Sequence, residues 1–146
     1  MRYIAFGWAY NANPTDTIFV SCPIAREYAS DPIKQVFVTV LNDTEGTVTC
    51  KVETFNERGE FVESSTLLQW LRRDLEDPDN FFPITKLVSN DRKDDDGGGS
   101  APYTSNPGGY YILQCFLPPL EQPPYLEPPH VEAAYIVRYL VEEVSN

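Results

Sequence analysis

Short runs of alternating hydrophobic and polar residues fill most of the chain, and turn-forming residues separate these runs. Within 33–41, for example, Val36, Val38 and Val40 fall on one side of an extended chain and the residues between them fall on the other. A two-residue period of this kind is typical of strands with one buried face. Similar runs predict strands over 3–10, 16–22, 33–41, 47–55, 60–65, 81–89, 110–117 and 132–142.

Strands at this spacing, joined by Asn-, Gly- and Pro-containing turns, are typical of a β-sandwich. A length of 146 residues suits one domain. The prediction is therefore all-β: a single-domain β-sandwich over residues 1–146, with about seven or eight mostly antiparallel strands.

One short helix is predicted near 66–76, where the period changes. Thr66 and Gln69 have the spacing of a capping box, and the following apolar residues recur at helical intervals up to Leu75. An extended conformation over 67–71 also fits the pattern, and this alternative stays open.

Three segments of the domain have a composition of their own. Residues 1–13 form an aromatic N-terminal strand or arm. Residues 90–109 are polar, acidic and rich in glycine, which predicts a flexible loop. Residues 118–130 contain repeated prolines, which predict an extended connector.

The chain is strongly acidic, with 11 Lys and Arg against 22 Asp and Glu and a formal net charge of −11. Phosphate backbones and anionic lipids repel such a polyanion, so neither a nucleic acid nor a membrane surface is expected as a partner. The longest apolar run is far below the roughly 18 residues that a membrane-spanning helix requires. A hydrophobic content of 42% is nonetheless too high for a disordered acidic chain.

The three cysteines, Cys22, Cys50 and Cys115, each stand on the apolar side of an alternating segment. All three sulfur atoms are therefore expected to face one core. Two interpretations stay open: three reduced, buried thiols, or one disulfide and one leftover thiol. The disulfide is favoured if the protein is exported. Cys50–Cys115 is the preferred pair, with Cys22 free, but spacing alone does not determine the connectivity.

Four motifs stand in the order Cys22-Pro-Ile-Ala-Arg26, Val48-Thr-Cys50, Tyr110-Tyr-Ile-Leu-Gln-Cys-Phe-Leu-Pro-Pro119 and Tyr135-Ile-Val-Arg-Tyr139. This pattern resembles a loose group of small bacterial exported β-sandwich proteins over about two thirds of the chain, and residues 66–105 depart from it. The resemblance implies export and a non-catalytic role, and it transfers no functional residues. The first residues lack the pattern of a signal peptide. A secreted, periplasmic or cell-surface location is therefore expected for a mature form, with a cytoplasmic location as the alternative.

Few residues have the pattern of a reactive or metal-binding site. Asp94, Asp95 and Asp96 suggest weak Ca²⁺ binding, but the spacing of an EF-hand loop is absent, and a solvated acidic loop is favoured. His130 is the single histidine and follows two prolines, so a surface position is favoured over catalysis. The glycosylation sequon that begins at Asn42 falls on a predicted turn, and such a tripeptide arises easily by chance. Neither a cofactor nor enzymatic activity is predicted.

Aromatic residues supply the remaining indication of function. Tyr3, Phe6, Trp8 and Tyr10 lie in a segment that is apolar on both faces, and 110–117 is apolar on the face opposite its cysteine as well. Ordinary core packing is one interpretation, and a protein–protein contact, including pairing with a neighbour's sheet edge, is the other. The leading hypothesis is a non-enzymatic, exported structural or interaction protein that assembles with itself or with a larger complex. A carbohydrate-binding module is the alternative, and a hydrolase comes third.

Overall fold

The computed structural model describes residues 2–24, 33–65, 67–76, 78–79, 82–89, 109–121 and 132–143, and the side chains of all of these except 2–8, 33–34, 63, 89 and 143. Within these ranges the chain forms nine strands and one short helix. In chain order these are β1 Arg2–Tyr10, β2 Ile18–Ile24, β3 Ile33–Asn42, β4 Val48–Phe55, β5 Phe61–Ser64, β6 Leu68–Trp70, α1 Arg73–Glu76, β7 Ile84–Ser89, β8 Tyr110–Leu117 and β9 Ala134–Glu143.

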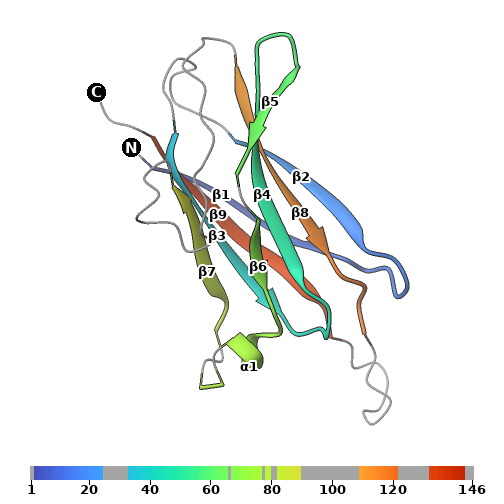
Figure 1. Ribbon diagram of the computed structural model, residues 1–146. Helices are drawn as coiled ribbons and strands as arrows, with labels where there is room; N and C mark the ends of the chain where they lie inside the picture. The colour runs from blue at the N-terminus through green and yellow to red at the C-terminus, as the bar shows by residue number, and fades with distance from the viewer. Residues whose placement is uncertain are drawn as a thin grey trace.

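The strands form two antiparallel sheets that lie face to face (Figure 1). One sheet has the order β1-β9-β3-β7, and the other has the order β2-β8-β4-β5. β6 pairs with the same side of β4 as β5 does, so β5 and β6 act as one interrupted strand. Successive strands mostly alternate between the sheets, which is the winding of an eight-stranded jelly roll made of two Greek keys. The predicted all-β sandwich is confirmed.

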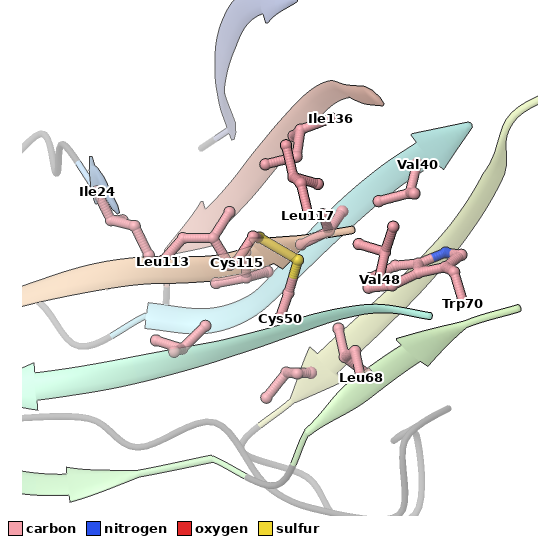
Figure 2. Close-up of a cluster of buried hydrophobic side chains, with 14 of the residues drawn as sticks. Ile24, Val40, Val48, Cys50, Leu68, Trp70, Leu113, Cys115, Leu117 and Ile136 are labelled. Carbon is pink, nitrogen blue, oxygen red and sulfur yellow. A yellow bond between two sulfur atoms is a disulfide. The ribbon is translucent and has the colours of Figure 1, made fainter. Parts of the chain in front are cut away.

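The core lies between the two sheets, where the alternating apolar residues of both inner faces meet (Figure 2). β3 contributes Val36, Val38 and Val40, each at most 1% exposed. β8 contributes Leu113 and Leu117 from the opposite sheet, together with its cysteine. These positions follow the two-residue period of the sequence, because one face of each sheet is covered by the other sheet.

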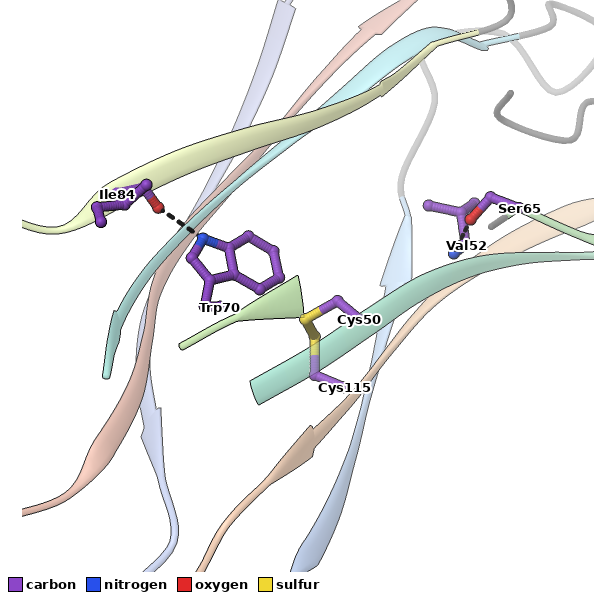
Figure 3. The surroundings of a disulfide bond; sticks show 6 residues. All are labelled: Cys50, Val52, Ser65, Trp70, Ile84 and Cys115. Atoms are coloured by element: carbon purple, nitrogen blue, oxygen red, sulfur yellow. Dashed lines mark hydrogen bonds between the residues drawn. A yellow bond between two sulfur atoms is a disulfide. The ribbon is translucent and has the colours of Figure 1, made fainter. Parts of the chain in front are cut away.

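The structure contains the disulfide between Cys50 and Cys115, and both residues are fully buried. The two cysteines are direct partners in the register of β4 and β8, so the bond joins neighbouring strands of one sheet. Figure 3 shows it on the inner face, near the indole of Trp70. Cys22 is the free cysteine and is only half-buried, packed against the border of the core. The preferred pairing is confirmed.

The segment 66–76 differs from the helix that its period predicts. The helix is confined to 73–76, and Leu68–Trp70 form β6, in agreement with the extended alternative for 67–71. Leu68 and Trp70 are each 1% exposed and lie opposite Cys50 and Val48, whereas Leu75 on α1 is 61% exposed. Pairing with β4 gives the backbone groups of β6 hydrogen-bond partners and buries the side chains of Leu68 and Trp70. Tertiary packing therefore overrides the helical spacing of the sequence.

Ser65 explains why β5 and β6 are separate strands. Its hydroxyl oxygen accepts a hydrogen bond from the Val52 N–H at 3.0 Å, and its own N–H donates to the Val52 carbonyl at 2.8 Å. The serine side chain therefore takes the place of a ladder partner at the interruption. The mismatch between the predicted and observed strand count arises here, because β6 falls within the predicted helix.

The predicted loop over 90–109 lies outside the described residues except for Gly109. Of the predicted connector over 118–130, residues 118–121 are described. The Leu120 N–H donates to the Asn13 carbonyl at 3.0 Å, and Glu121 forms an isolated antiparallel bridge with Glu132. The start of the connector is thus held against the β1–β2 turn.

Candidate interaction surfaces

The N-terminal aromatic segment forms β1, an edge strand paired with β9 (Figure 1). Tyr3 lies opposite Val141 and Phe6 opposite Arg138, and Trp8 falls in the register irregularity between Phe6 and Ala9. Tyr10 is 52% exposed, and its ring lies 5.4 Å from that of Tyr135, its register partner. The four residues singled out by the sequence are therefore brought together on one strand.

The sheet edges differ in how open they are to another strand. β7 lies beside β6, and the Trp70 indole N–H donates to the Ile84 carbonyl at 3.0 Å (Figure 3). β2 contains Pro23, which lacks a backbone N–H, and β5 has only four residues. β1 has nine residues, contains no proline and carries Arg2 as its one charged residue. Among the described residues no strand lies against its outer side.

Aromatic side chains occupy two opposite ends of the outer face of the β2-β8-β4-β5 sheet. At one end, Phe19 and Phe116 are register partners with ring centroids 5.0 Å apart. At the other end, the Tyr110 ring stacks on Phe55 at 5.1 Å, and Phe55 contacts Phe61 edge-on at 6.1 Å. The outermost rings are the most exposed, with Phe19 at 51% and Phe61 at 57%.

The middle of this face is mainly polar. Ser21 pairs with Gln114, and Gln114 pairs with Lys51 across the three strands. The Lys51 ammonium lies 2.9 Å from the Glu53 carboxylate, which is nearly buried. The apolar residues of this region are Pro23 and Ile112. The outer face therefore has apolar ends, a hydrogen-bonding centre, and an ion pair whose two charges cancel.

Two buried asparagines hold the loops at one end of the sandwich. The Asn11 amide donates to the Leu117 and Pro118 carbonyls at 3.0 and 3.1 Å. The Asn42 amide donates to the Gly46 and Trp70 carbonyls at 2.8 and 3.1 Å. Each asparagine therefore joins the last residue of a strand, Leu117 or Trp70, to a residue of a turn or loop, Pro118 or Gly46. Asn42 is 1% exposed with its amide engaged, so in the folded protein it is no acceptor for the glycan that the sequon suggested.

Ion pairs attach the segment around α1 to the β3–β4 turn. Arg73 lies 2.7 Å from Asp43, and Arg72 contacts both Glu45 and Asp74. The hydrogen bond between Arg72 and Asp74 lowers the pKa of the Asp74 carboxyl and raises the pKa of the Arg72 guanidinium. Exposed pairs of this kind position a loop and contribute little to stability. Because these carboxylates are paired with arginines, we assign the cluster the role of holding α1 against the β3–β4 turn.

The residues considered for calcium and for catalysis, Asp94, Asp95, Asp96 and His130, lie outside the described residues. Across the described ranges, no group of three or more His, Cys, Asp or Glu side chains is arranged to hold a metal ion. Burial raises the pKa of the Cys22 thiol above its ordinary value of 9.0, which reduces its reactivity as a nucleophile.

The aromatic ends of the outer face were only partly visible in the sequence. The alternation in 110–117 placed Tyr110 and Phe116 opposite Cys115, but Phe19, Phe55 and Phe61 belong to other strands. They join the same face only through the registers of β2, β4 and β5, which alternation within a single strand does not determine.

In the part of the chain that is described, no helix is both long and apolar enough to cross a membrane. The buried disulfide indicates an oxidising environment outside the cytoplasm. Searches of protein-family models, curated proteins and solved structures found no match to this chain.

Proposed function

We propose that this chain is a non-enzymatic, exported interaction protein that assembles with a second copy of itself through the outer edge of β1. The observation that carries the proposal is the contrast between the sheet edges. β1 is long, apolar and unprotected, whereas the other edges are short, contain proline or lie beside another strand. Unpaired backbone N–H and C=O groups along such an edge accept a strand from another molecule.

A second copy fits this edge by symmetry and by local charge. Two β1 strands related by a two-fold axis run antiparallel, so the same edge serves both molecules. β1 carries one arginine and no acidic residue in a chain of net charge −11. Contact through β1 therefore keeps the acidic residues of the two copies out of the shared ladder. Long-range repulsion between the copies remains, so association should strengthen as added salt screens it.

Export is supported by the buried disulfide and by the resemblance to small exported β-sandwich proteins. Disulfides form and persist mainly in oxidising compartments, such as the periplasm and the cell exterior. A structural role fits this setting, because a sandwich with a covalent crosslink is a durable support for an exposed edge.

Sedimentation equilibrium over a range of protein and salt concentrations tests the proposal, with the adjacent variants Ala5→Pro and Phe6→Pro. Successive N–H groups of a strand point to opposite sides, so one variant removes an N–H that pairs with β9 and the other removes an outward N–H. The variant that removes an N–H paired with β9 should lose thermal stability. The variant that removes an outward N–H should keep its stability and become monomeric.

Truncation of 1–10 is a poorer test, because β1 pairs with β9 of the same molecule and its removal would expose the edge of β9. A wild-type protein that stays monomeric at every concentration and salt level would contradict self-assembly. So would a dimer that persists unchanged in both proline variants. A monomer that binds a strand from a different protein would place β1 in a larger complex instead of a homodimer.

A further inference from the structure

The outer face of the β2-β8-β4-β5 sheet has its apolar groups at opposite corners. Phe19 stands on the edge strand β2, and Phe61 stands on the edge strand β5 at the other end. Tyr110 and Phe116, the inner members of the two clusters, are six residues apart on β8. At about 3.4 Å per residue this separation is about 20 Å. A ligand that contacts both ends must therefore be extended.

We propose that this face binds an uncharged linear polysaccharide, with sugar rings against the aromatic ends and hydroxyl groups on the polar centre. Each ring of a polysaccharide has C–H groups on its faces and hydroxyl groups around its rim. The C–H groups are attracted to the electron-rich faces of aromatic rings. The polar centre offers the exposed or half-buried side chains of Ser21 and Gln114, and Thr49 lies beside Phe116. All three side chains can donate and accept hydrogen bonds.

The distribution of polarity favours this ligand over a protein partner. Protein interfaces concentrate their apolar contacts at the centre and surround them with a polar rim. On this face the order is reversed, since the exposed rings of Phe19 and Phe61 are at the periphery and Gln114 and Lys51 are in the middle. A chain of repeated, partly polar units makes the same kind of contact at both ends without a central apolar cluster.

The charge of the face selects an uncharged ligand. Single-stranded nucleic acids also stack on aromatic rings, but they require a positively charged groove along their backbone. Among the described side chains of β2, β8, β4 and β5 on this face, the cation is Lys51, and its ammonium lies 2.9 Å from the Glu53 carboxylate. Anionic polysaccharides are disfavoured for the same reason, and by the net charge of −11. This face and the β1 edge belong to different sheets, so the two proposals are independent.

Affinity electrophoresis in native gels tests the inference with neutral and anionic polysaccharides. The neutral set is hydroxyethyl cellulose, xyloglucan, galactomannan and soluble starch, and the anionic set is alginate and pectin. At least one neutral polymer should retard the wild-type protein, and the anionic polymers should not. Phe19→Ala and Phe61→Ala should each weaken retardation at least fivefold. Phe82→Ala, which removes a ring that is 75% exposed but lies between α1 and β7, should have no effect.

Three results would overturn the inference. Mobility that is unchanged in every neutral polymer would remove the ligand class. Retardation equal in wild type, Phe19→Ala and Phe61→Ala would place binding elsewhere on the molecule. Weakening by Phe82→Ala to the same extent would indicate non-specific adsorption of exposed rings. The monomeric β1 proline variant should still be retarded, which separates this test from that of self-assembly.

Discussion

The Cys50–Cys115 bond should supply a large part of the folding stability. The bond closes a segment whose ends are 65 residues apart in sequence. In the chain-entropy treatment, a crosslink that closes a loop of that length stabilises the folded state by about 4 kcal/mol, because it restricts the unfolded chain. Typical domains are stable by only about 5–15 kcal/mol. Loss of the crosslink should therefore lower the urea midpoint by a large fraction of its value.

Three samples isolate this contribution. Urea titrations followed by circular dichroism compare the oxidised protein, protein unfolded and refolded in reductant, and the Cys50→Ala/Cys115→Ala double variant. Reduction removes the crosslink and keeps both sulfur atoms, so the difference between the last two samples reports the lost packing of two fully buried side chains.

Cys22→Ala serves as the matched control, because it deletes a half-buried thiol and leaves the crosslink intact. It should cost about 1 kcal/mol or less. A difference below about 1 kcal/mol between oxidised and reduced protein would refute the loop-closure argument. It would mean that the unfolded chain is already compact enough to keep the two cysteines close.

Three further perturbations have definite expected outcomes. Asn42→Ala should destabilise the protein by about 3 kcal/mol in urea titrations, because it leaves two carbonyl acceptors of its amide without their donor. Gly46→Ala should lower the melting temperature, since its new Cβ would lie 2.5 Å from the Cβ of Pro118 and force two loops apart, at about 1–3 kcal/mol. Burial raises the pKa of Cys22 above 9.0 and that of Tyr139 above 10.0. The folded state therefore holds both protons to higher pH than the unfolded chain does, and the free energy of unfolding should fall as pH rises above about 9, less steeply in Cys22→Ala.

Strand positions and the composition of the core could be predicted from residues 33–41 and similar runs, because a sheet with one covered face imposes a two-residue period. The inward direction of Cys50 and Cys115 follows from the same period. The bond between them also requires β4 to pair with β8. The sequence favours this disulfide but does not determine that pairing. The proline- and asparagine-containing turns were equally informative, because those residues restrict the backbone locally.

The prediction was least successful where long-range packing decides the conformation. Trp70 fits a helical period in the sequence, yet the open side of β4 and the Ile84 carbonyl hold it in a strand. The aromatic ends of the outer face depend on register between strands that are distant in sequence, such as Phe19 with Phe116. The sequence pattern places Asn42 in a turn, whereas the hydrogen bond from its amide to the Trp70 carbonyl depends on the folded arrangement.

The position of the crosslink also governs what a protease can release. The turn between β4 and β5 lies between the two bonded cysteines in sequence, and Arg58 in this turn has a side chain that is 79% exposed. Trypsin cleavage after Arg58 would leave both fragments attached to each other through the sulfur atoms. A nicked molecule would migrate as one species in a non-reducing gel and as two after reduction. Intactness of the polypeptide is therefore properly judged from the mass of the reduced, unfolded chain.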